Sequence, residues 1–133
     1  MTDPAPRPTT TDGPLPRWHP DTLRAAGWAL RAVVVARRAY RRSGVAHVRL
    51  PEVRAVDHRA QRGVLAVLSR TRQRCLVRAT VRQAWLAAHG EPRDLIIGVT
   101  RPGAGFRAHA WLEGDDPGHH EGYTELTRRQ APS

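Results

Sequence analysis

The 133-residue sequence contains no lysine, a single cysteine and no long hydrophobic run. Without lysine, chemistry that uses a lysine nucleophile or a Schiff base is excluded. Because Cys75 has no partner within the chain, we expect no disulfide framework and a reducing compartment, the cytoplasm. The longest apolar stretch, residues 25–36, is interrupted by Arg31 and is shorter than the ~20 apolar residues that span a bilayer.

The first 17 residues are rich in proline and threonine, a composition that buries little apolar surface. They also lack the basic start and apolar centre of a secretory signal. We therefore expect a disordered arm over residues 1–17, one folded domain over residues 18–129 and a short tail over residues 130–133. With 40% apolar residues, the chain has enough for one modest core.

Charge is strongly unbalanced, since 22 basic residues, all arginine, face 12 acidic ones and leave a net charge of +10. Such a surface suits an acidic peptide, an acidic partner protein or nucleic acid. The arginines are scattered along the chain, and no aromatic-rich strand or nucleic-acid motif accompanies them. The alternative interpretation is that the arginines form a solvated surface and bind no charged partner. We prefer an acidic peptide or partner protein and predict no nucleic-acid partner.

Two helices are predicted before the cysteine. The first has an apolar helical period, a candidate N-cap at Asp21 or Thr22, and an end at Ser43, after an arginine-rich last turn. The second is predicted over residues 52–69, where Gly63 weakens the helical pattern.

A third helix and three strands follow. The helix opens at Cys75 and runs for about fifteen residues, with Gly90 as its C-cap. Residues 94–101 have the β-branched, apolar character of a buried strand, and residues 106–113 alternate as a strand does. After a turn, residues 119–126 are expected to return as a partner strand. The order indicates an α+β fold in which the helix that opens at Cys75 packs on a small antiparallel sheet.

Cys75 and His109 together suggest nucleophilic thiol catalysis. Only the thiolate attacks a carbonyl well, and a free cysteine with a pKa near ~8.5 is mostly protonated at neutral pH. A helix N-terminus and a nearby imidazole both favour the thiolate. The alternation places His109 on one strand face with Trp111 and Glu113. The alternatives are a buried, inert cysteine and a histidine that only packs.

The sequence resembles a known family at three motifs. These are Cys-Leu-Val-Arg-Ala at the predicted helix start, Ile-Gly-Val in the next strand, and Ala-His-Ala-Trp-Leu-Glu over residues 108–113. They resemble the transglutaminase-like cysteine peptidases of lasso peptide biosynthesis, in the form where the protease is a separate chain. The resemblance covers residues 53–129 and implies a transglutaminase-like or papain-like core. It also implies that the chain removes the leader from a ribosomally made precursor peptide, acting with a small leader-recognition protein and a cyclase and without a cofactor.

By this resemblance the family's Cys-His-Asp triad includes Cys75 and His109. The family's aspartate lies on the strand after the histidine, where this chain offers a glutamate. The resemblance therefore implies Glu121 as the acid, with Asp116 as the second choice. A glutamate can orient an imidazole as an aspartate does.

Other residues near the thiol have proposed roles. Gln73 either shapes the oxyanion site or belongs to a polar turn, and the backbone N–H of Cys75 is expected to contribute to the oxyanion hole. Trp111 is placed among the candidate substrate-binding residues; packing is the preferred role for it, and the alternative is an aromatic wall beside the thiol that shields the ion pair from water. A zinc site would need Cys75, His109 and either His119 or His120, but no short-spaced ligand pair supports it, and no metal is predicted. The alternatives to a peptidase are a transglutaminase or amidase with the same residues, and a non-catalytic arginine-rich adaptor that binds acidic peptide or nucleic acid.

Overall fold

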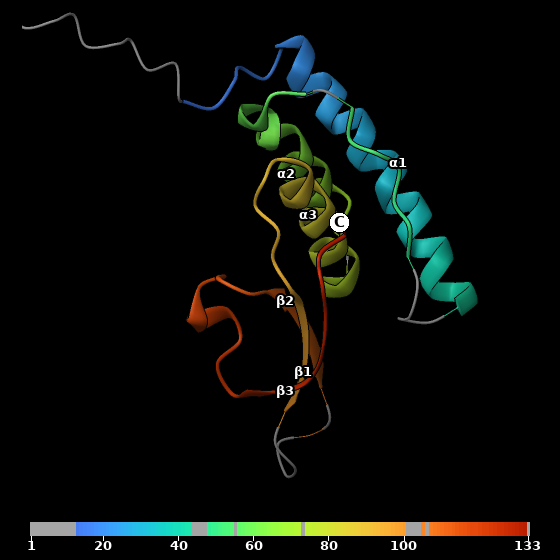
Figure 1. The fold of residues 1–133 in the computed structure, drawn as a ribbon, viewed down its shortest axis with the longest axis vertical. Helices are drawn as coiled ribbons and strands as arrows, with labels where there is room; N and C mark the ends of the chain where they lie inside the picture. Colours follow the sequence, from blue (N-terminus) through green and yellow to red (C-terminus); the bar gives the residue numbers. More distant parts are fainter. Residues whose placement is uncertain are drawn as a thin grey trace, which may run out of the picture.

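The computed structural model describes residues 13–43, 48–54, 56–72, 74–100, 105 and 107–132. Within these residues, three α-helices precede a three-stranded antiparallel sheet (Figure 1). The predicted α+β class is confirmed. The elements are α1 (Pro20–Ser43), the 3-10 helix η1 (His58–Ala60), α2 (Gln61–Arg70), α3 (Cys75–Ala88), β1 (Leu95–Thr100), β2 (Ala108–Leu112), the 3-10 helix η2 (Pro117–His119) and β3 (Tyr123–Arg129).

The first helix, α1, begins at Pro20, earlier than predicted. Proline suits the first helical turn because the N–H that it lacks would have no intrahelical partner there. His19 precedes the helix, and its carbonyl accepts the first helical hydrogen bond. Its Nδ1 also accepts the Asp21 N–H at 3.1 Å, while the Thr22 hydroxyl donates to the Pro16 carbonyl at 2.9 Å. The expectation of a cap at Asp21 or Thr22 is therefore wrong, because His19 occupies the cap position.

The second helix is shorter than the predicted span of residues 52–69. Its helical part begins with η1 and continues as α2, so the described residues of the predicted span before η1, residues 52–54, 56 and 57, are not helical. The Asp57 carboxylate accepts the Arg59 N–H at 2.9 Å and starts the helix there. A ring nitrogen of His89 lies 2.7 Å from the Val56 carbonyl oxygen, so that carbonyl bonds to α3's end instead of to a helical turn. Tertiary contacts thus replace the predicted first turns.

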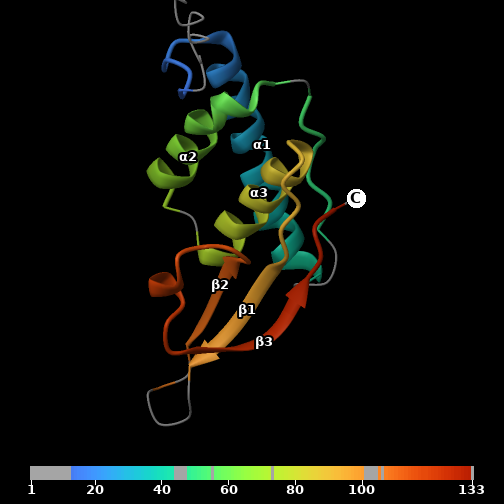
Figure 2. The same cartoon turned by 60° about the vertical axis from the view of Figure 1, so that its left-hand side comes forward.

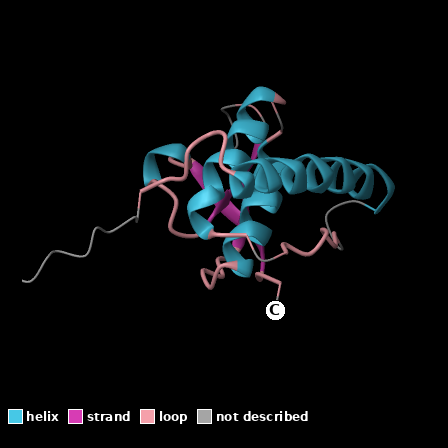
Figure 3. Ribbon diagram, turned by 90° about the horizontal axis from the view of Figure 1, so that it is seen from above, coloured by secondary structure: helices cyan, strands magenta, loops and turns pink. Residues whose placement is uncertain are grey.

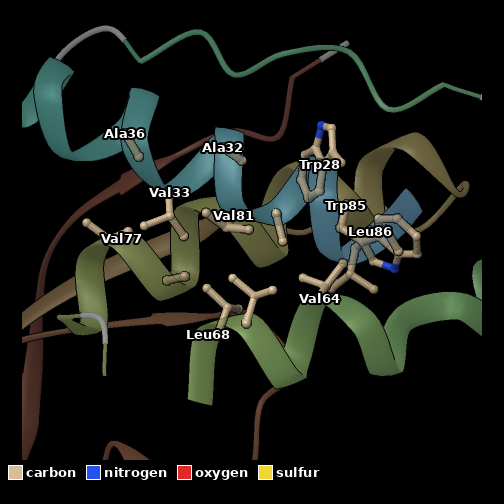
Figure 4. Packing of buried hydrophobic residues seen from close by; sticks show 14 of the residues in the cluster. Trp28, Ala32, Val33, Ala36, Val64, Leu68, Val77, Val81, Trp85 and Leu86 are labelled. Atoms are coloured by element: carbon tan, nitrogen blue, oxygen red, sulfur yellow. The ribbon is translucent and has the colours of Figure 1, made fainter. Parts of the chain in front are cut away.

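The core lies between the three helices and one face of the sheet. Figure 4 shows apolar side chains of α1, α2 and α3 meeting at its centre. Helices α1 and α2 approach so closely that a Cβ at Gly63 would collide with the Thr22 carbonyl oxygen. The glycine that weakened the predicted helix is therefore required by packing. The largest fully buried side chains are Trp85, Leu68, Leu95, Leu112, Val64 and Val81.

The folded part of the chain begins before residue 18. Leu15, inside the predicted arm, is buried in the core, and its N–H donates to the Arg59 carbonyl at 3.1 Å. The predicted arm is therefore too long at its C-terminal end. Residues 1–12 of that arm lie outside the described residues.

The sheet has the strand order β2-β1-β3, with both pairings antiparallel (Figure 2). Residue Leu95 of the central strand pairs with Leu112 on one side and Arg129 on the other. The expected return strand of residues 119–126 begins only at Tyr123 and pairs with β1 instead of β2, so the predicted hairpin is wrong. The intervening segment, residues 113–122, carries the chain across β1 to its free edge.

The two faces of the sheet have different neighbours. Leu95, Ala110 and Leu112 belong to the main core beneath the helices. Trp111 is also buried, but it lies outside that cluster because alternation along β2 turns it to the opposite face, together with His109. β2 is an edge strand, so side chains of both faces can border a cleft at this edge.

Candidate active site

Cys75 is the first residue of α3 and is half-buried. Arg74 before it has an extended backbone (φ −59°, ψ 151°) and makes no side-chain cap. The first N–H groups of a helix have no intrahelical partner, and the helix dipole adds partial positive charge there. A negative charge that develops on an oxygen beside this turn would therefore be stabilised. The prediction that Cys75 opens a helix is confirmed.

His109 lies on β2, opposite Gly98 of β1. Its ring is flanked by two aromatic rings, with centroid distances of 5.8 Å to Trp111 and 5.1 Å to Tyr123. Tyr123 comes from β3, so the imidazole is held by side chains from two strands. This packing restricts the orientations of the ring, as a general base requires.

Trp111 forms a buried wall next to His109. The side chain is 7% exposed, and its six-membered ring occupies the space where Gly98 would carry a side chain. The other neighbour is His120, whose ring stacks on the indole at 4.7 Å with an interplanar angle of 5°. The absence of a side chain at Gly98 makes room for the indole, and Trp111 and Cys75 both line one cleft.

Cys75 and His109 border the same cleft, which has a volume of about 710 Å³. Helix α2 forms one side with Leu65, a residue that the sequence did not indicate because its position depends on how α2 packs. Arg78 and Arg82 follow Cys75 by three and seven residues and lie on the same helix face. The cleft is lined by Gln61, Leu65, Cys75, Arg78, Ala79, Arg82, His109, Ala110, Trp111, Asp115 and Asp116.

Asp115 ties the loop after β2 to α3 at the border of the cleft. Its two carboxylate oxygens accept hydrogen bonds from Arg82 at 2.9 and 3.0 Å, a bidentate pair. One of them also accepts the Leu112 N–H at 3.1 Å. Burial raises the pKa of Asp115, but the hydrogen bonds from Arg82 and Leu112 outweigh it, so the pKa lies below its ordinary value. The carboxylate is thus ionised, and both of its oxygens are used in hydrogen bonds that hold the loop.

The two acids considered for the triad differ in position. Asp116 is exposed and borders the cleft, and one of its oxygens accepts the Gly118 N–H at 3.0 Å, which caps η2. Glu121 is exposed and does not line this cleft. The geometry therefore brings Cys75, His109 and Asp116 to one cleft, without Glu121.

A comparison with protein-family models decides the family. The model described as the transglutaminase-like superfamily matches residues 19–129. The chain belongs to the transglutaminase-like superfamily. Members generally carry cysteine-based hydrolase or transferase chemistry, and the α+β arrangement agrees with their core. Neither the curated proteins nor the solved structures contain a match to this chain.

In this transglutaminase-like domain, the described histidine, cysteine, aspartate and glutamate residues do not gather in a group of three that could hold a metal ion. His120, considered as a zinc ligand, instead stacks on Trp111, and its buried Nδ1 makes no hydrogen bond. Gln73, expected near the oxyanion site, lies outside the described residues. No helix in the part of the chain that the structure describes has the length and apolar character needed to cross a membrane.

Proposed function

We propose that this chain is a cysteine peptidase that cleaves the leader from a lasso precursor peptide. The observation that carries the proposal is that Cys75, at the first turn of α3, and His109, on β2, border one cleft. Superfamily membership supports cysteine-based acyl chemistry. The motifs around these two residues supply the narrower substrate class.

In the proposed reaction His109 accepts the thiol proton and the Cys75 thiolate attacks the scissile carbonyl. The tetrahedral oxyanion lies near the first-turn N–H groups of α3, where the backbone N–H of Cys75 donates to it. The imidazolium then protonates the leaving amine, and the C–N bond breaks. His109 then takes a proton from water as the water oxygen attacks the thioester carbonyl. The C–S bond breaks, the product leaves as a carboxylic acid that ionises in solution, and the imidazolium returns its proton to the Cys75 sulfur.

We assign the acid that orients His109 to Asp116 ahead of Glu121. Asp116 borders the cleft, whereas Glu121 does not. Asp115 also borders it, but both of its oxygens bind Arg82. Replacing Asp116 with asparagine is expected to lower kcat at least about tenfold, while Glu121→Gln has a small effect. If Glu121→Gln lowers kcat more than Asp116→Asn does, the acid is Glu121.

The proposed substrate is delivered by other proteins. A small leader-recognition protein presents the precursor peptide, and a cyclase closes the ring after cleavage. Purified chain alone is expected to cleave a precursor peptide poorly and to be stimulated by the recognition protein. Rapid cleavage without that protein would contradict this part of the proposal.

The central experiment combines the chain, the recognition protein and a precursor peptide and follows leader release by mass spectrometry. Cys75→Ala and His109→Ala should each reduce cleavage by about 10³-fold or more. Leu126→Ala, which changes an exposed leucine of β3, is a matched control that should retain activity. Full cleavage by the Cys75→Ala protein would end the peptidase proposal.

Acyl transfer to an amine is the second candidate, because the superfamily includes transferases. It uses the same thioester, so the two functions differ only in which nucleophile resolves it. A labelled primary amine added to the cleavage assay separates them. Incorporation of the label into the product at the expense of hydrolysis would favour a transferase, and free carboxylate alone favours the peptidase.

Rapid alkylation of Cys75 by iodoacetamide at about pH 6 separates both enzymes from a non-catalytic adaptor. A thiol activated by His109 reacts quickly at that pH, and the His109→Ala variant should slow the reaction. Equal and slow labelling of both proteins would favour the adaptor. Tight nucleic-acid binding that falls steeply with salt would support the electrostatic adaptor instead.

A further inference from the structure

The outward face of α1 carries an apolar seam that nothing in the described structure covers. Leu23, Leu30 and Val34 are 55%, 50% and 48% exposed, although α1 buries a separate row of alanines and other apolar residues in the core. With Gly27, they follow each other at spacings of four, three and four residues. This is the alternation of the d and a positions of a coiled coil. The seam spans about 16 Å at ~1.5 Å per residue.

Arginines flank this seam in the same repeat. Arg24, Arg31 and Arg38 are exposed and seven residues apart, and the first two directly follow Leu23 and Leu30. They occupy the e positions, which in coiled coils form ion pairs with the partner helix. The seam is therefore basic along one side, and its complement is a helix with acidic residues beside an apolar stripe.

Gly27 gives a second reason to expect a helix on this face. A glycine inside a helix is less favourable than alanine, and a Cβ at this position would meet no atom of the protein within 4 Å. The fold therefore does not need glycine there. The contrast is Gly63, whose missing side chain lets α2 approach α1. A missing side chain at Gly27 would let a second helix approach α1 in the same way from outside.

We propose that α1 docks an amphipathic helix of a partner protein, with an apolar stripe against Leu23, Leu30 and Val34 and glutamates or aspartates against the arginine row. Figures 1 and 3 show α1 as a long helix whose C-terminal end extends beyond α2 and α3. A second copy of this chain is a poor occupant, because two copies would oppose their arginine rows at a net charge of +10 each. A membrane surface is also poor, because a glycine in the middle of the seam adds no apolar area.

The probe is a synthetic helical peptide of about four heptads with leucine at a and d and glutamate at e and g. A matched peptide has lysine at e and g. Binding to the full chain is measured by fluorescence anisotropy at low and moderate salt. The glutamate peptide should bind at least about tenfold more tightly than the lysine peptide, and its affinity should fall with salt. Equal binding of the two peptides, or no binding of the glutamate peptide, overturns the proposal.

Variants of α1 locate the binding site. Leu30→Glu combined with Val34→Glu should weaken binding of the glutamate peptide at least about tenfold, whereas Leu126→Glu on β3 should not. Gly27→Gln should raise the unfolding midpoint, because glutamine is a better helix former, and yet weaken binding. A higher unfolding midpoint together with weaker binding would show that the variant loses the docking surface and not the fold. Unchanged affinity in the α1 variants overturns the proposal. Two other results would also overturn it. In the first, the free chain forms a dimer that these variants abolish while peptide binding is unchanged. In the second, the chain adsorbs to anionic phosphatidylserine vesicles and the variants abolish that adsorption while peptide binding is unchanged.

Discussion

Replacing Gly98 with alanine tests whether the Trp111 wall of the candidate active-site cleft depends on a missing side chain. A Cβ at this position would lie 2.5 and 2.7 Å from two ring atoms of Trp111 and 3.0 Å from the Thr124 carbonyl oxygen. Overpacking of this kind costs about 1–3 kcal/mol, offset by up to about 1 kcal/mol because alanine suits a strand better than glycine. We expect Gly98→Ala to lower the free energy of unfolding by about 1–2 kcal/mol, measured from urea midpoints.

A double-mutant cycle identifies the cause. Trp111→Leu removes the colliding ring atoms, so alanine at position 98 should cost about 1 kcal/mol less in that background. Some of the cost should remain, because the Thr124 carbonyl stays in place. Gly27→Ala is the matched control and should stabilise the protein by about 0.5–1 kcal/mol, since its Cβ meets no neighbour. An equal penalty for Gly98→Ala with and without Trp111 would refute the reasoning.

Three further predictions concern packing and ionisation. Gly63→Ala should lower the free energy of unfolding by about 2–3 kcal/mol in urea titrations, because its Cβ meets the Thr22 carbonyl and backbone atoms cannot turn aside; a stabilised variant would contradict the close helix contact. Asp115→Asn should cost about 1–2 kcal/mol at pH 7, a value discounted because the pair with Arg82 is partly exposed. Because the folded-state pKa of Asp115 is lowered, this stabilisation is complete above the ordinary carboxyl pKa near ~4 and declines as the pH falls below it. The difference in unfolding free energy between wild type and Asp115→Asn should therefore be smaller at about pH 3 than at pH 7, and unchanged at about pH 9. Gln83→Leu should cost about 1–3 kcal/mol by the same measurement, because its buried amide donates to two backbone carbonyls; a change below about 0.5 kcal/mol would argue against those bonds.

Local features of the sequence predicted the parts of the site that depend on short segments. The helical period after Cys75 correctly predicted α3, and Gly90, whose φ is +79°, lies one residue beyond the observed C-cap, His89. Alternation over residues 106–113 correctly placed His109 and Trp111 on one face of a strand, β2, where their rings stack. Prediction failed for the turns before η1, where the Pro51 and Val56 carbonyls bond to Trp28 of α1 and to His89 after α3 and these contacts override helical propensity.

The sequence by itself determined a thiol at a helix start, a histidine on an alternating strand, and a superfamily motif that joins them, because helix caps and strand alternation are written in neighbouring residues. Only the tertiary structure decided that β3 pairs with β1, that α2 contributes Leu65 to the cleft, and that Asp116 borders it while Glu121 does not. The physical reason is that alternation shows which residues of a strand share a face, but not which strand lies beside it. That choice depends on the packing of segments far apart in the chain, whose contacts leave no local pattern.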